Sequence, residues 1–313
     1  MNDKNKVLVT VDGSNQAFDT ARYAGRILAG CEARIVLYHV RLTVDEAILD
    51  MGINPAGRRR MAEIRAWDNE QRKAADALLE KSREVMEQAG VARERITLRA
   101  SPRAIGIARD IIKESRNGYD AVMVGRRGHH RVKGLVLGSV ANKLIERLRH
   151  VSLCVVGGNP PPEKVLIALD ASEGAMRAVD HVVSTRCGHG SRQIYLVHVV
   201  RTRSAMPAPI FAQLPLDEVE LLLAEASQAI QPVFQSATQR LEAAGFERDR
   251  IHTEVMTGVE SRSTALIQFA RQNEIGSMVM GRRGLSRVKD FIMGRVGHKI
   301  VNTVRNRAVL LVP

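Results

Sequence analysis

Aromatic residues are scarce in this chain of 313 residues, in which Phe, Trp and Tyr together make up 4%. Proteins that hold single-stranded nucleic acid stack its bases on aromatic side chains, so the shortage argues against that class of protein. Long hydrophobic runs are missing too. No stretch reaches the roughly 18 apolar residues that a membrane-spanning helix needs. The sequence therefore predicts no membrane segment.

Cysteine is rare as well, and Cys31, Cys154 and Cys187 lie far apart in the chain. Disulfide-stabilised domains and zinc sites need cysteines at short, paired spacings. The pattern therefore predicts neither a disulfide framework nor a metal site. Because residues 1–6 carry no apolar signal segment, we expect a cytoplasmic protein.

Negative charge is in deficit. The chain carries 47 Lys and Arg against 34 Asp and Glu, a net charge of +13. Most of the excess falls in residues 1–158, which hold 28 of the basic and 19 of the acidic residues. Excess positive charge attracts nucleotides and nucleic acids alike. With so few aromatic residues a nucleotide is the more fitting anion, and a basic nucleic-acid-associated protein stays open as an alternative.

The sequence repeats itself once along its whole length. Residues 6–14 (KVLVTVDGS) match residues 164–172 (KVLIALDAS), and residues 37–41 match residues 196–200. Near-continuous apolar strands alternate with amphipathic helices in both copies, which is typical of a parallel sheet covered by helices on both faces. A repeat of this length predicts two domains rather than a solenoid.

We therefore expect an α/β fold of two tandem doubly wound domains, residues 1–158 and residues 163–313. The segment between them, residues 157–162, is rich in glycine and proline and suits a short linker.

Each copy contains a glycine loop directly after a short apolar run. The first loop reads G-x2-G-x9-G-S over positions 125–139, and the second reads G-x2-G-x9-G-R over positions 281–295. Glycine lets backbone N–H groups approach a ligand, and the start of the following helix adds unpaired N–H groups and a positive dipole end. Each loop thus predicts a phosphate site. A tight turn that binds nothing is the structural alternative.

The strand that ends in Asp12, the His39-Val40 strand end and the loop at positions 125–139 resemble the universal stress protein family, in its tandem, nucleotide-binding form. The resemblance covers essentially the whole chain. It implies a five-stranded parallel sheet in the order 3-2-1-4-5 in each half, with ATP bound where the strand order switches. It leaves open whether Mg²⁺ accompanies the ATP, since the sequence does not identify ligands for it.

By this resemblance, Asp12 makes polar contact with the adenosine and the backbone of Val40 contacts the base. The glycine loop and the helix after it receive the phosphates, through Gly125, Arg126, Gly128, Gly138 and Ser139.

A weaker second site is expected from the matching residues of the second half, because arginine replaces serine there. The arginine could grip a phosphate, fill the pocket or bridge to the aspartate. These residues are Asp170, Val199, Gly281, Gly284, Gly294 and Arg295.

The chain contains neither a G-x-S-x-G nor a G-x4-G-K-[ST] motif, so neither esterase nor P-loop chemistry is indicated. No catalytic residue is predicted. We expect an ATP-binding stress-response or regulatory protein, and a slow ATPase or phosphotransferase on the same site stays open.

Residues 152–156 and 308–312 form the edge strands of the two expected sheets, and both are apolar and uncharged. Such edges promote aggregation unless something covers them. We expect the two edges to cover one another, as the resemblance also implies. Pairing of whole chains into a homodimer stays open.

Overall fold

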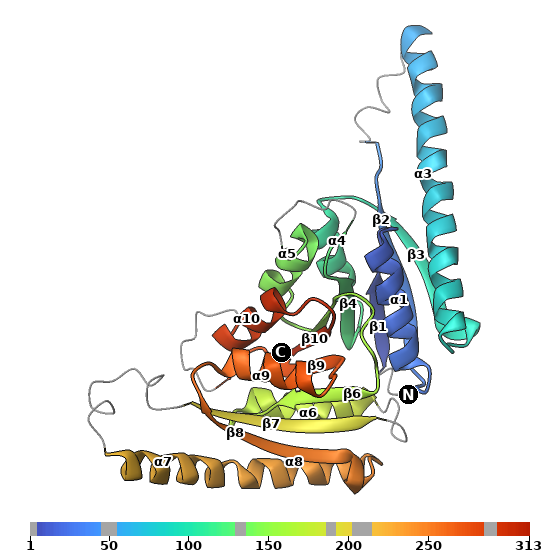
Figure 1. Cartoon of the computed structure of the whole chain (residues 1–313). Helices are drawn as coiled ribbons and strands as arrows, with labels where there is room; N and C mark the ends of the chain where they lie inside the picture. The colour runs from blue at the N-terminus through green and yellow to red at the C-terminus, as the bar shows by residue number, and fades with distance from the viewer. Residues whose placement is uncertain (1–4, 45–54, 129–135, 186–191, 202–214, 285–292) are drawn as a thin grey trace.

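The computed structural model describes residues 5–44, 55–128, 136–185, 192–201, 215–284 and 293–313. Its strands form one mixed ten-stranded sheet in the order β3-β2-β1-β4-β5-β10-β9-β6-β7-β8 (Figure 1). The strands are β1 (Lys6–Thr10), β2 (Arg34–Arg41), β3 (Ile96–Pro102), β4 (Ala121–Gly125), β5 (Ser152–Val156), β6 (Lys164–Ala168), β7 (Gln193–Arg201), β8 (Ile251–Val259), β9 (Ser277–Gly281) and β10 (Ala308–Val312).

The two expected five-stranded parallel sheets are therefore joined into one continuous sheet. Strands within each half pair in parallel, whereas β5 and β10 pair antiparallel, with Ala308 opposite Val156 and Leu311 opposite Leu153. These are the two apolar edges that the sequence analysis placed against one another. We call this strand pair, and the contacts across it, the seam.

Helices cover both faces of the sheet. They are α1 (Asn15–Leu28), α3 (Pro55–Gln88), α4 (Ile107–Glu114), α5 (Ser139–Arg147), α6 (Glu173–Thr185), α7 (Leu216–Ala229), α8 (Gln231–Ala243), α9 (Arg262–Gln272) and α10 (Arg295–Thr303). In Figure 1, α3 extends far beyond the sheet, whereas the corresponding part of the second half consists of α7 and α8. Pro232 lies in the first turn of α8, where proline is tolerated, unlike at interior helix positions.

Three clusters of buried side chains make up the core. One contains side chains of α1 and α3, and another contains side chains of α6 and α8. The third runs across the seam, because it joins Leu144 of α5 and Ile111 of α4 to Ile300 of α10 and Leu266 of α9. The two halves thus share a core on this face.

Polar contacts also cross the seam, and two of them come from helix residues at matching positions of the repeat. Tyr23 of α1 places its hydroxyl 2.6 Å from the hydroxyl of Ser277 in the other half. At the matching position, His181 of α6 places Nδ1 3.2 Å from the hydroxyl of Ser152. Burial lowers the pKa of His181 to about 4, an effect that Asp120 partly offsets. Each half therefore anchors a helix to the other half's sheet.

Among the described cysteines, Cys154 of β5 is buried and has a free thiol. Cys31 is disulfide-bonded, although the cysteine pattern predicted no disulfide framework. As for membrane segments, none of the helices in the described ranges combines the length and apolar character that a span requires.

Candidate functional site

A cavity of about 630 Å³ opens at the carboxyl ends of β1, β2 and β4. It lies where the chain leaves β1 toward one side of the sheet and β4 toward the other, the usual ligand position in such folds. Six of the seven residues predicted for the first site line it, namely Asp12, Val40, Gly125, Gly128, Gly138 and Ser139. The seventh, Arg126, does not.

Asp12 is held in a tight turn between β1 and α1. Its Oδ1 accepts hydrogen bonds from the Ser14 N–H at 3.0 Å and from the Ser14 hydroxyl at 2.7 Å. The same hydroxyl accepts from the N–H of Ala17 at 3.2 Å, which caps α1. This turn points the carboxylate across the cavity toward the glycine loop.

The Asp12 carboxylate leaves no room for a side chain at the second glycine of the loop, Gly128. A Cβ atom on Gly128 would lie 2.3 Å from Asp12 Oδ2, so any larger residue would push the loop and Asp12 apart. The loop then closes through a 2.8 Å hydrogen bond from the Gly138 N–H to the Arg126 carbonyl. Gly138 is the N-cap of α5, so the first N–H groups of that helix face the cavity.

Arg126 corrects the sequence prediction. Its guanidinium points away from the cavity and donates to the carbonyls of Val136 at 3.0 Å, Val301 at 2.6 Å and Asn302 at 3.0 Å. The last two carbonyls belong to the final turn of α10 in the other half, which has no helical donors of its own. Burial, with the nearby Arg127 and Arg305, lowers the pKa of Arg126 to about 10. Arg126 is therefore a residue of the seam.

Arg282 repeats this arrangement from the second half. It is buried, and its Nη1 donates to the carbonyl of Ile145 in the last turn of α5 at 2.8 Å. Each glycine loop thus supplies an arginine to the end of the helix that starts at the other loop. The sequence pattern of two adjacent arginines held no signal that the first of each pair would turn to the seam.

The remaining walls of the first cavity are largely apolar. Leu42 and Ile107 lie at its mouth with exposed fractions of 46% and 40%, and Val40 lies deeper. We call these three residues the apolar wall. Arg103 and Arg127 also line the cavity. Sequence reasoning missed Leu42, Arg103 and Ile107, because none of them belongs to the glycine pattern.

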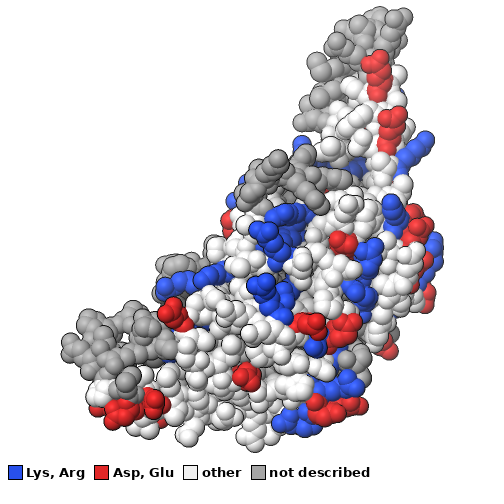
Figure 2. Space-filling model, in the orientation of Figure 1, with Lys and Arg blue, Asp and Glu red and all other residues white. Residues whose placement is uncertain are grey.

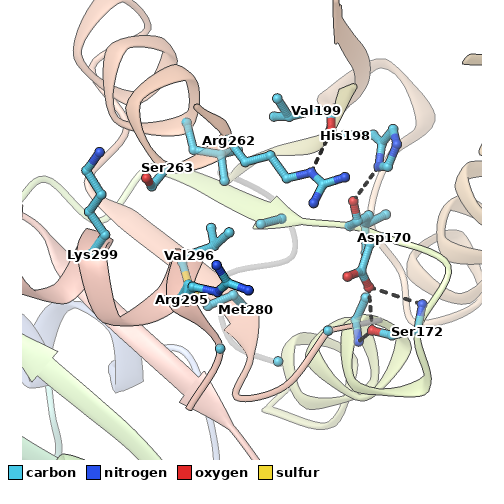
Figure 3. A pocket seen from close by; sticks show the side chains of 18 of the residues that line it. Asp170, Ser172, His198, Val199, Arg262, Ser263, Met280, Arg295, Val296 and Lys299 are labelled. Atoms are coloured by element: carbon cyan, nitrogen blue, oxygen red, sulfur yellow. Dashed lines mark hydrogen bonds between the residues drawn. The ribbon is translucent and has the colours of Figure 1, made fainter. Parts of the chain in front are cut away.

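A second cavity of about 530 Å³ occupies the matching place in the second half (Figure 3). All six residues predicted for the weaker site line it, namely Asp170, Val199, Gly281, Gly284, Gly294 and Arg295. The turn is the same as in the first half, because Oδ1 of Asp170 accepts from the Ser172 N–H at 3.1 Å and from the Ser172 hydroxyl. A Cβ on Gly284 would lie 2.5 Å from Asp170 Oδ2.

Arg295 is the first residue of α10 and reaches into this second cavity (Figure 3). One of the three expectations for it was a bridge to the aspartate. Within the described ranges Asp170 and Arg295 form no ion pair, and Oδ1 of Asp170 accepts hydrogen bonds from Ser172 instead. The cavity around Arg295 is open, so this side chain does not fill it.

The two histidines that end β2 and β7 have a structural role. Nδ1 of His39 donates to the carbonyl of Val11 at 2.8 Å, and Nδ1 of His198 donates to the carbonyl of Leu169 at 2.8 Å. Both bonds tie a strand end to the turn after the neighbouring strand. No cluster of three His, Cys, Asp or Glu residues suited to a metal ion occurs in the part of the chain that the structure describes.

Comparison with known proteins supplies a family. The model of the universal stress protein family matches residues 4–155 and again residues 162–313. A universal stress protein from Archaeoglobus fulgidus DSM 4304 is similar in structure, with a TM-score of 0.62, 19% identity and 98% of each chain covered.

A functionally unknown protein from Pseudomonas aeruginosa PAO1 has a TM-score of 0.53 and 12% identity over 98% of this chain and 92% of that one. A universal stress protein solved in complex with cAMP matches 48% of this chain and 97% of its own, with 20% identity and a TM-score of 0.35. At these identities the likeness concerns the fold alone.

Proposed function

Because the chain belongs to the universal stress protein family, we propose that its first half binds ATP and that the protein acts as a nucleotide-dependent stress-response regulator. The observation that carries the proposal is one cavity that joins three features: an apolar wall, the Asp12 carboxylate, and a glycine loop with a helix start. An adenine, a ribose and a phosphate chain need these features in this order.

The binding mode follows from the positions of these groups. The adenine would pack between Val40, Leu42 and Ile107, with the Val40 backbone at its polar edge. The Asp12 carboxylate, which faces the glycine loop across the cavity, would accept hydrogen bonds from the ribose hydroxyls. The phosphates would lie over the glycine loop, where Ser139 contributes a hydroxyl and the start of α5 contributes N–H groups.

Binding rather than rapid catalysis is the better expectation. Of the described residues that line the cavity, Asp12 alone carries a carboxylate, and its Oδ1 is bonded to the Ser14 N–H and hydroxyl. A general base for water attack must lie within hydrogen-bond reach of that water near the terminal phosphate. In the proposed binding mode Asp12 would contact the ribose instead, so bound ATP would be hydrolysed slowly and would act as a signal.

Calorimetric titration with ATP tests the proposal. In Gly138→Val the side chain would occupy the space between the loop and the phosphates, since even a Cβ there lies 3.3 Å from the Arg127 Cα. We expect affinity to fall by at least tenfold. Ser139→Ala removes one hydroxyl and should weaken binding by about 0.5–1.5 kcal/mol.

The matched control is Gly294→Val, which makes the same change in the second half. Far-UV circular dichroism checks that each variant is folded. If a folded Gly138→Val protein binds ATP as tightly as the parent, the first cavity is not the ATP site.

A further inference from the structure

The second cavity is lined by far more positive charge than the first. Its described lining includes six cationic residues, of which Arg282 turns its guanidinium to the seam, but only two carboxylates, Asp170 and Glu260. The first cavity has Arg103 and Arg127 against Asp12. The six come from three parts of the fold: the end of β7 with the start of α9, the loop after β9, and α10. They are Arg201, Arg262, Arg282, Arg283, Arg295 and Lys299.

We propose that this second cavity binds a compact ligand with two or more phosphate groups and no nucleobase. The site is distinct from the proposed ATP site, and the two proposals stand or fall separately. Like charges gathered in a cavity repel one another and favour a multivalent anion as their counter-charge. Arginine also presents a planar set of donors that matches phosphate oxygens in pairs.

One of these arginines holds an unused donor. The Nε of Arg201 is buried and has no hydrogen-bond partner within the described structure. A buried donor without an acceptor costs stability, so a ligand that supplies oxygen atoms would relieve the cost there.

In the second cavity, the side that corresponds to the apolar wall of the first is cationic and not apolar. Arg262 is the first residue of α9, as Ile107 is the first residue of α4. Arg201 follows the LVHVV segment as Leu42 follows the LYHVR segment. Two members of the apolar wall in the first cavity therefore correspond to arginines in the second.

Arg262 also binds the backbone carbonyl that would otherwise be available to a base. Its Nε donates to the Val199 carbonyl at 3.2 Å, and Val199 corresponds to Val40. Burial and the positive charge of Arg201 lower the pKa of Arg262, with Asp170 acting in the opposite direction. The guanidinium is thus fixed over the strand end, where it meets anionic oxygens and not the face of a purine.

The side of the second cavity at the start of α10 also carries an additional positive charge. Arg295 stands at the start of α10, where the backbone N–H groups of the helix end already favour an anion. In Figure 3 the side chains of Arg262 and Arg295 reach from opposite sides into the same central space. A ligand that fills this space would contact both, which requires phosphates at two ends of a short molecule.

The experiment uses inorganic tripolyphosphate as the probe and the full chain with Gly138→Val, which closes the first cavity. We expect tripolyphosphate to bind this protein with micromolar affinity or better and ATP to bind at least tenfold more weakly. The double variant Arg262→Ile/Arg295→Ser installs the first half's residues and should weaken tripolyphosphate at least tenfold, with a shallower dependence on salt. Arg103→Ser, at the other cavity, is the matched control.

Binding of ATP as tight as that of tripolyphosphate would overturn the proposal, as would no binding of tripolyphosphate to the folded Gly138→Val protein. Unchanged affinity in a folded double variant would do the same. If the double variant does not fold, Lys299→Gln, at the cavity and on the exposed face of α10, provides the same comparison. None of these outcomes bears on ATP binding by the parent's first cavity, which the titrations above test.

Discussion

The first and second halves share the backbone of their cavities and differ in the side chains that line them. In both, a serine holds an aspartate in place, and a glycine of the loop leaves no room for a Cβ beside that carboxylate. The differences lie elsewhere, at Leu42 and Arg201, at Ile107 and Arg262, and at Ser139 and Arg295. A repeated loop motif therefore determines the shape of a cavity without determining all the side chains that line it.

Surface charge is mixed on the face drawn in Figure 2. Lys and Arg lie over the middle of the molecule, where α5 and α10 lie, and also beside Asp and Glu along α3 and at the lower right, whereas Asp and Glu are prominent at α7. The helices that begin at the two glycine loops therefore lie in a region with positive charge. Anionic ligands would be attracted toward this region.

The two cavities depend on the seam that keeps the halves together. The largest expected effect therefore comes from a substitution that disrupts the seam. Val155→Lys would bury a charge opposite Val309, at a position that is 2% exposed. An unpaired buried charge costs about 3–5 kcal/mol. We expect a lower unfolding midpoint in urea and faster proteolysis at the linker near Pro161. Leu310→Lys, which is less buried, should have a smaller effect. Equal protease resistance of Val155→Lys and the parent would contradict this view of the seam.

The two seam arginines should prove unequal. Arg126 donates three hydrogen bonds, whereas Arg282 donates one and leaves two nitrogens unpartnered in the described structure. We expect Arg126→Met to destabilise by about 2–4 kcal/mol and Arg282→Met by about 1–2 kcal/mol, measured by urea unfolding.

Arg127→Met provides the control for Arg126, because Arg127 is its neighbour in the loop but lines the first cavity. Its replacement should lower ATP affinity and change stability little. The same loss of stability in both variants would mean that position in the loop, and not the seam contact, accounts for the effect.

The last prediction concerns pH and a single half. His181 has a pKa of about 4 because it is buried, below the ordinary value of 6.5, so the unfolded chain binds a proton more readily. Stability should therefore be full above pH 6.5 and fall as the pH drops from 6.5 toward 4, by no more than about 1.4 kcal/mol per unit. Tyr23, its counterpart, does not titrate there.

Urea unfolding at pH 7, 6 and 5 would compare the parent with His181→Gln. The variant keeps a polar side chain near Ser152 and should lose the His181 contribution to the pH dependence. Parallel pH profiles for the two proteins would show that His181 does not cause the acid sensitivity.

Much of the architecture could be predicted, because it depends on patterns that are local in the sequence. Apolar runs mark the strands, and the repeat places the edges of residues 152–156 and 308–312 in equivalent positions. The single sheet was not predicted as such, since whether two edges merge depends on their geometry after folding.

For the site, the glycine pattern led to twelve lining residues but misplaced Arg126. The direction of an arginine in a loop depends on which carbonyls lie near it, and these belong to a helix about 175 residues away. The arginines that distinguish the second cavity could have been found. When the starts of α4 and α9 are aligned, Arg262 corresponds to Ile107, and both positions lie outside the glycine motif.

The linker at residues 157–162 has a consequence for symmetry. In a dimer of identical chains, every substitution appears at both related sites. Here the two sites are encoded separately, so serine can stand at position 139 while arginine stands at position 295. The covalent connection also makes the pairing of β5 with β10 independent of protein concentration. Each molecule consequently carries one apolar-walled and one arginine-lined cavity, in a ratio that dilution does not change.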